Sequence, residues 1–451
     1  MTLLGTALIA ALGIALSVRR GWLPVVIGVA AGLPYSAGVV VGGNGVPLFT
    51  LAAAASAVAL LSSPRLGTAH WSANAFAVFV AWATIVTALA PWLFAGTRVL
   101  VAREGVDSQV ADPGVLAYSV SNGAQLGYLL LAACAALYLV RVRGAVVAAG
   151  VALTVGTVLT TIRGLLLAVR ADVLAPVFDT LPNVAYAWTT PDDRLRGVFS
   201  EPSELAAFSL PAAAFFIVAA LRARGRSRFL WSVACALACS NLLQASSGTA
   251  VVASAVVIGL GVVVLAVRYV LRGGVGTPWL VIGTLTAAVV ALVAGDHLLA
   301  PIQELVAEKV DSKSYDSRTG ADAFSWGVLS DTLGLGAGLG SNRPSSFGMS
   351  LLSTVGIPGA AAFAVMVSGV LVTAIRTPAT VAAAVALGAL VVAKFVGTPD
   401  FSTPILWVLI AACAVPTWTR GRDHPAPTPV RIPPGAPNAT APALVSSGVR
   451  P

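Results

Sequence analysis

Long apolar runs separated by short polar breaks make up most of this 451-residue chain. A membrane-spanning helix needs about 20 consecutive apolar residues, with a range of roughly 17–25. Runs of this kind, the shortest being marginal, fall at 2–18, 22–41, 46–62, 74–95, 115–140, 144–168, 203–221, 229–245, 247–270, 278–295, 346–374, 378–395 and 403–417. The pattern predicts an all-α fold, a polytopic transmembrane bundle of about 12–14 helices.

The composition agrees with a lipid environment. Hydrophobic residues make up 57% of the chain and charged residues only 10%, and the mean hydropathy is +0.90. Soluble domains carry about 25% charged residues, so one aqueous core could not enclose this much apolar surface. The first run, 2–18, lacks a basic n-region and a cleavage site, so we expect a retained helix rather than a signal peptide.

Basic residues are distributed unevenly between the two ends of the expected spans. Threading the chain back and forth puts sixteen of the 27 basic residues and one acid, Asp423, on one side and all other acids on the opposite side. Short loops rich in Lys and Arg face the cytoplasm. We therefore expect the segments 96–114, 169–202 and 296–345 to be long extracytoplasmic loops. The net charge of +9 follows from this orientation, so we expect no nucleic-acid partner.

The organisation along the chain is simple. We expect one transmembrane domain, residues 1–417, with no attached soluble domain. Residues 418–451 are rich in Pro, Ala and polar side chains and are expected to form a disordered cytoplasmic tail. The four cysteines lie in expected spans without metal-site spacing, and the three histidines are scattered. We therefore expect no metal site and no cofactor.

A stretch that begins at Arg194 and reads RLRGVFSEPSELAAF carries polar residues into an apolar run. Arg194 and Arg196 are expected at the outer mouth of the bundle, followed by Gly197, which permits a close backbone approach. Arginine beside apolar sequence is costly unless it is paired. An interfacial anchor explains each arginine taken alone, but the run as a whole favours a functional role.

The same stretch predicts the start of a helix. Pro202 suits the first helical turn, Ser203 can cap the helix, and Glu204 complements its positive end. A capped helix entry beside lipid headgroups accounts for these three residues without any catalytic role. It does not account for the arginines and Glu201 that precede them.

A second polar segment carries similar chemistry. Residues 315–332 are expected to form a short helix that includes Arg318, and Arg343 follows the run GLGAGLGSN, whose glycines either bring amides to a ligand or make turns. Arg163 lies near the outer end of its apolar run. Arginine presents a planar fork of donors matched to phosphate oxygens, so arginines converging from several outer loops predict a pyrophosphate site. The glycine run lacks the GxxxxGK[ST] pattern of a nucleotide-binding loop.

In these two segments the chain resembles the O-antigen ligase and polymerase group, the Wzy/WaaL-like integral membrane glycosyltransferases. RGVFSEPSELAAF is similar to the family's Arg-Gly-x-Phe-x-Glu/Asn-Pro pattern at the head of a helix. SRTGADAFSWGVLSDTLGLGAGLGSNRPSSFGMSLLSTVGIPGAAAF is similar to its outer loop, and LLQASSGTA to its Ser-rich turn before a span. The resemblance covers most of the chain in topology and implies an architecture of the GT-C type.

The resemblance implies a reaction on glycans carried by polyprenyl diphosphate at the extracytoplasmic face of the plasma membrane. A hydroxyl of a glycan acceptor attacks the anomeric carbon of the donor, and the polyprenyl diphosphate leaves. In the ligase branch a histidine follows the Gly-x-Gly stretch, whereas here the region reads SNRPSSFGMS. This departure favours a polymerase, which extends one lipid-linked glycan with another, over a ligase that uses a different acceptor.

The resemblance also implies roles for residues in a metal-independent mechanism. Glu201 is the first choice, and Glu204 the second, to accept the proton of the attacking hydroxyl. Arginines stabilise the charge that develops on the leaving diphosphate. The expected set is Arg196 and Arg318, with Arg343, Arg194 and Arg163 also in the substrate site.

A lipid-linked glycan flippase or transporter is the alternative from another functional class. A transporter typically places ionisable residues near the middle of broken helices. In this sequence, apart from Arg163 and Lys394, the charges outside the cytoplasmic loops fall at the outer mouth. That distribution favours chemistry at the membrane surface, so we expect an enzyme.

Overall fold

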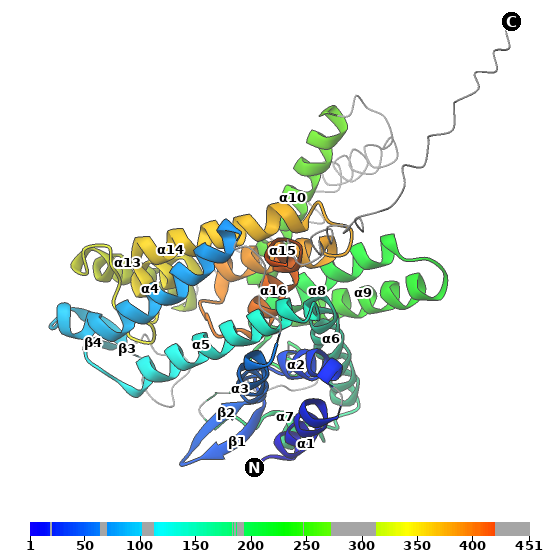
Figure 1. Ribbon diagram of the computed structural model, residues 1–451, viewed down its shortest axis with the longest axis horizontal. Coiled ribbons are helices and arrows are strands. Elements are labelled where there is room, and N and C mark those ends of the chain that lie inside the picture. Colours follow the sequence, from blue (N-terminus) through cyan, green and yellow to red (C-terminus); the bar gives the residue numbers. More distant parts are fainter. Residues whose placement is uncertain are drawn as a thin grey trace, which may run out of the picture.

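The computed structural model describes residues 1–18, 20–63, 70–101, 112–182, 184, 186, 194–246, 248–271 and 313–419. This part of the chain is predominantly helical and carries two small two-stranded sheets (Figure 1). The expected span at 278–295, the first part of the expected loop at 296–345 and the expected tail beyond residue 419 lie outside the described residues.

Helices follow one another through most of the chain. They are α1 (Leu3–Ser17), η1 (Arg20–Trp22), α2 (Leu23–Ala31), α3 (Leu48–Leu61), α4 (Trp71–Leu93), α5 (Val120–Arg141), α6 (Ala145–Ala168), α7 (Ala175–Phe178), α8 (Pro202–Arg222), α9 (Gly225–Ala245), α10 (Gly248–Leu271), α13 (Lys313–Asp331), α14 (Phe347–Ala374), α15 (Val381–Gly397) and α16 (Pro404–Trp418). The strands form two antiparallel hairpins, β1 (Ala37–Val41) with β2 (Asn44–Pro47) and β3 (Arg98–Val101) with β4 (Asp112–Val115).

Among the described residues, five helices are long and apolar enough to cross a membrane: α4, α5, α6, α8 and α14. α1, α3, α15, α16 and the Val251–Val264 part of α10 are apolar but shorter. These helices confirm the predominantly helical class, and five of them have the length and composition to cross a membrane. α13 confirms the short helix expected at 315–332. The larger number of spans expected from the sequence stays a prediction.

The span expected at 22–41 is wrong. Only α2, nine residues long, is helical there, and the chain then enters the β1–β2 hairpin. Pro34 follows the end of α2 and cannot continue a helix. Gly42 and Gly43, with φ of 56° and 79°, make the two-residue turn that joins the strands. The hydrophobicity of this run therefore reflects a short buried helix plus valine-rich β-structure.

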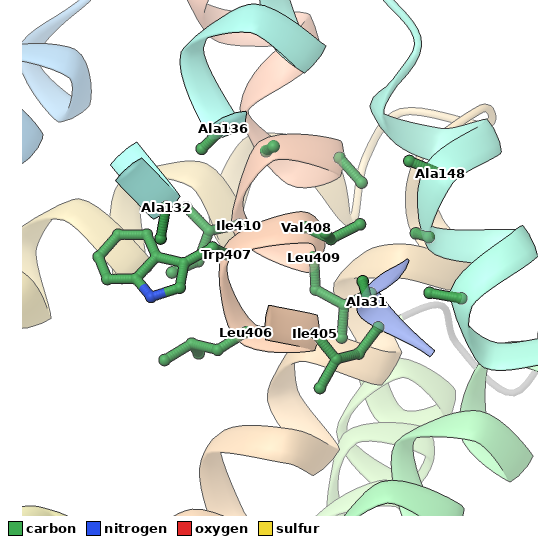
Figure 2. Packing of buried hydrophobic residues seen from close by; sticks show 14 of the residues in the cluster. Ala31, Ala132, Ala136, Ala148, Ile405, Leu406, Trp407, Val408, Leu409 and Ile410 are labelled. Carbon is green, nitrogen blue, oxygen red and sulfur yellow. The ribbon is translucent and has the colours of Figure 1, made fainter. Parts of the chain in front are cut away.

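α16, the last helix among the described residues, forms the centre of the core. Its residues 405–410 are all almost fully buried. Figure 2 shows these side chains against small residues of α2, α5 and α6, among them Ala31, Ala132 and Ala148. Alanine lets neighbouring helices approach closely, as is common where helices pack in a bilayer. Because α16 also contacts α14 and α15, this 15-residue helix is enclosed by longer ones (Figure 1).

α14 is interrupted at Gly356, whose φ of 68° and ψ of −176° are not helical. The carbonyl groups before the break find partners outside the helix. The amides of residues 337–338 donate to the carbonyls of residues 353–354 at 2.8 Å, and Trp82 Nε1 donates to the carbonyl of Val355 at 2.7 Å. The glycine-rich run therefore forms a turn that completes the broken helix.

Candidate active site

A cavity of about 500 Å³ is lined by residues of α2, α3, α5, α8, α14, α15 and α16. Much of its wall is apolar and aromatic, as is usual for a small-molecule site. Four lining residues carry charged side chains: Glu204, Arg343, Lys394 and Asp400. Tyr35 adds a hydroxyl. Charge is expensive inside an apolar bundle, so its concentration at one cavity marks this cavity as the candidate site.

Both polar segments singled out by the sequence contribute to the cavity wall. The stretch that begins at Arg194 supplies Phe199 and Glu204. The glycine-rich segment supplies Leu339, Gly340, Asn342, Arg343 and Pro344. Segments far apart in the chain thus meet at one place in space.

Asn342 fixes the glycine-rich segment in the wall. Its side chain is 4% exposed, its Oδ1 accepts from the amide of Leu100 at 2.9 Å, and its Nδ2 donates to Ser325 Oγ at 2.9 Å and Ser353 Oγ at 3.0 Å. A second buried amide, Asn122, holds the preceding residues by donating to the Leu339 carbonyl at 2.8 Å. Buried and fully bonded amides of this kind specify a single loop conformation.

The two glutamates at the start of α8 differ in position. Glu204 lies in the first turn of α8 and lines the cavity. Glu201 is the residue that precedes α8, is partly buried, and accepts a hydrogen bond from the Ser203 hydroxyl. The expected helix start is therefore confirmed, but Ser203 is not its cap, because its hydroxyl is bonded to Glu201. Of the two expected bases, Glu204 faces the cavity, and Glu201 is not among the lining residues.

Tyr35 is a further polar residue of the cavity wall. Ser200 and Glu204 lie near enough to its hydroxyl to influence its ionisation. Burial, together with the negative charges of Glu204 and Asp400, raises the pKa of Tyr35 well above its ordinary value. Tyr35 therefore stays protonated and can donate a hydrogen bond to the Glu204 carboxylate.

Lys394 lies in the last turn of α15, and Asp400 lies on the segment that connects α15 to α16. The Lys394 side chain is 1% exposed, and its Nζ donates to Thr403 Oγ1 at 2.8 Å and to the Thr398 carbonyl at 3.3 Å. Asp400 accepts from the amide and hydroxyl of Ser402, each at 2.8 Å. Sequence reasoning noted Lys394 only as a charge inside a span and missed Asp400. An ionisable residue within an apolar run was the available indication.

Arg163 and Arg196 converge on one carboxylate rather than on the cavity. Asp179 Oδ1 and Oδ2 accept from Arg163 at 2.9 and 2.8 Å and from Arg196 at 3.0 and 2.5 Å. Arg163 also binds both oxygens of Asp172 and donates to the carbonyl of Gly197 at 2.9 Å. The two arginine side chains are 0% and 5% exposed. Both arginines are therefore paired with carboxylates, as expected for arginine beside apolar sequence.

This four-residue ion cluster, Arg163, Arg196, Asp172 and Asp179, fixes the described part of the segment 169–202 against α6. Burial opposes ionisation of Asp179, but hydrogen bonds and charge from both arginines outweigh it and lower the pKa of Asp179. Tyr186 lies 5.2 Å from the Arg196 guanidinium and donates to the carbonyl of Tyr35 at 2.6 Å. The ion cluster is therefore connected through Tyr186 to Tyr35 of the cavity wall.

The close approach expected of Gly197 is present. Its φ is 58°, and a Cβ there would lie 2.3 Å from Thr160 Cγ2. This glycine lets the chain pass directly over α6, so that the carbonyl of Gly197 reaches Arg163.

The other expected arginines lie apart from the ion cluster. Arg194 is exposed, and Arg343 is exposed beside the cavity, its amide donating to the Leu100 carbonyl at 3.2 Å. Arg318 lies in α13, and its side chain is outside the described residues. A shared diphosphate contact of Arg196 and Arg318 stays a prediction. Among the described residues, no group of three or more His, Cys, Asp or Glu could hold a metal ion.

The fold and the cavity define a predominantly helical chain with apolar, membrane-length helices and a charged internal site. No protein-family model matches the chain, and no curated protein matches it either.

Proposed function

We propose that the protein is a membrane glycosyltransferase of the O-antigen ligase and polymerase type. It joins glycan units carried on polyprenyl diphosphate at the extracytoplasmic face of the plasma membrane, without a metal, and acts as a polysaccharide polymerase. One observation carries the proposal: the two segments that resemble this group line the same cavity and bring Glu204 and Arg343 to it. The uneven distribution of basic residues supports the orientation, with the C-terminus cytoplasmic.

Glu204 is the general base in this proposal, because it lines the cavity whereas Glu201 is bonded to Ser203 beside it. The acceptor hydroxyl transfers its proton to the Glu204 carboxylate as its oxygen bonds to the anomeric carbon. The bond from that carbon to the diphosphate oxygen breaks, and its electron pair leaves with the polyprenyl diphosphate. Tyr35 orients the Glu204 carboxylate through its hydroxyl.

Cations stabilise the negative charge that develops on the leaving diphosphate. Arg343 is the arginine of the expected set that lines the cavity. Arg163 and Arg196 act indirectly, because both are paired with Asp179 and Arg163 also with Asp172, and they position the wall that carries Phe199.

The test is elongation of a polyprenyl-diphosphate-linked oligosaccharide by the purified full chain in nanodiscs, with and without EDTA. Wild type is expected to give a ladder of longer lipid-linked glycans that survives EDTA. Glu204→Gln is expected to lower the rate about 10²–10⁴-fold, the usual contribution of a general base. Glu201→Gln is the matched control and is expected to stay within about tenfold of wild type. Equal loss in both variants, or loss in Glu201→Gln alone, contradicts the assignment of Glu204.

A lipid-linked glycan flippase is the second candidate, favoured by the break of α14 at Gly356 and by Lys394 within α15. Broken helices and internal charges are typical of transporters. Protein-dependent movement of labelled glycolipid across a vesicle membrane, without any elongation, would select this function instead.

A further inference from the structure

Lys394 is a buried cation on the cavity wall whose pairing within the protein is incomplete. Its ammonium group has three donors, and the protein supplies two acceptors, Thr403 Oγ1 at 2.8 Å and the more distant Thr398 carbonyl at 3.3 Å. The Nζ also lies 5.2 Å from the centre of the Phe347 ring. Among the described residues, no carboxylate makes an ion pair with it.

An unpaired charge at this depth is costly for the fold. A buried ammonium is normally paired with a carboxylate, and loss of its partner is strongly destabilising. Glu204 and Asp400 line the same cavity, and their negative charges act on Lys394 at a distance, without an ion-pair contact. The remaining donor of the ammonium has no hydrogen-bond acceptor among the described residues, and a ligand in the cavity that Lys394 lines can complete its coordination.

The other buried cations of the described part are already paired with carboxylates. Arg163 and Arg196 are each bidentate to Asp179, and Arg163 is bidentate to Asp172 as well. A diphosphate that bound them would have to displace carboxylates. Lys394 needs no such displacement.

We propose that Lys394 binds an anionic phosphate group of the ligand in this cavity and that Thr403 positions its ammonium for the contact. The inference rests on the proposed function for the identity of the ligand, a lipid-linked diphosphate. A lysine suits the task because its ammonium is a compact charge that binds phosphate without a fixed fork geometry. α15, which carries Lys394, packs against α8, which carries Glu204 (Figure 1). In this proposal two neighbouring helices therefore supply the cation for the leaving group and the general base.

The experiment measures binding of farnesyl diphosphate to the purified full chain in detergent. Lys394→Gln is expected to weaken binding roughly ten- to a hundredfold, the effect of losing a hydrogen bond to a charged group. Lys394→Arg is expected to restore most of the affinity. Arg376→Gln, which removes an exposed cation at the end of α14, is the matched control and is expected to bind as wild type does.

Competitors identify the source of the phosphate. Inorganic pyrophosphate, farnesol and phosphatidylglycerol micelles are added separately to bound farnesyl diphosphate. Competition by pyrophosphate but not by farnesol supports phosphate recognition by Lys394, and competition by phosphatidylglycerol assigns the same contact to a lipid headgroup. Competition by farnesol alone overturns the proposal, because the site would then recognise the apolar chain.

A second variant keeps the test decisive where Lys394→Gln does not fold. Thr403→Val removes the hydroxyl that holds the ammonium and is expected to weaken binding several-fold. Unchanged affinity in Lys394→Gln or, where that protein is not folded, in Thr403→Val overturns the proposal. If wild type elongates the glycan but these variants bind farnesyl diphosphate as wild type does, the role of Lys394 is wrong and the proposed function stands. If binding depends on Lys394 but wild type does not elongate the glycan, the polymerase function is wrong and the role of Lys394 in phosphate binding stands.

Discussion

Asp179 holds two buried arginines at once, so Asp179→Asn is expected to destabilise the fold strongly. Its carboxylate accepts hydrogen bonds of 2.5–3.0 Å from Arg163 and Arg196, whose side chains are 0% and 5% exposed. Asparagine removes the charge and turns one acceptor into a donor that faces guanidinium N–H groups. Removing one partner of a buried ion pair costs about 3–5 kcal/mol. We expect the free energy of unfolding to fall by about this amount.

Asp172→Asn is the matched control for this substitution. Asp172 is 27% exposed and pairs with Arg163, which keeps Asp179 as its other partner. Because the pair is partly solvated, the expected loss is about 1–2 kcal/mol.

The assay is unfolding of both variants by SDS in mixed micelles, followed by tryptophan fluorescence. Unfolding of Asp179→Asn at the wild-type midpoint, or a larger loss of stability in Asp172→Asn than in Asp179→Asn, contradicts this prediction.

Three further predictions concern pH, the broken helix and the glycine-rich segment. The lowered pKa of Asp179 means that its stabilisation is complete above the ordinary aspartate value of about 4 and is lost as pH falls through the lowered value; unfolding midpoints should be flat above about pH 4 and fall below it, less so in Asp179→Asn. Gly356→Ala should cost at least about 2 kcal/mol, because its φ is 68° and a Cβ would lie 2.3 Å from the Leu335 carbonyl carbon. Gly13→Ala, in open space within α1, should instead stabilise by about 0.5–1 kcal/mol in the same thermal-shift series. Asn342→Leu should lose about 3 kcal/mol and most elongation, since it leaves the Leu100 amide and two serine hydroxyls without this partner.

The helical class and most long helices follow from hydrophobic run length alone. The start of α8 was predicted from Pro202 and its neighbours, because local backbone preferences determine such ends. The run at 22–41 was mispredicted because apolar content does not separate a span from a short helix followed by a valine-rich hairpin. There the deciding features, Pro34 and the Gly42–Gly43 turn, are local and were visible in the sequence.

The candidate site was predicted only in part. Sequence order indicated that arginines beside apolar runs need partners, but which carboxylate pairs with them depends on three-dimensional packing. Asp179, in a loop of mixed polarity, gave no sign that it would bind both Arg163 and Arg196. Glu204, in the first turn of α8, lines the cavity and Glu201, which precedes the helix, does not; which of them does so depends on how α8 packs against the helices around it.

The most direct test of the proposed site is a cryo-EM structure of the protein in nanodiscs with a non-hydrolysable analogue of a polyprenyl-diphosphate-linked glycan. We expect density for the diphosphate and the first sugar inside the cavity, between the Glu204 segment of α8 and the wall formed by Arg343 and Lys394. Density at the ion cluster around Asp179 instead, or a cavity that stays empty at saturating analogue, would contradict it.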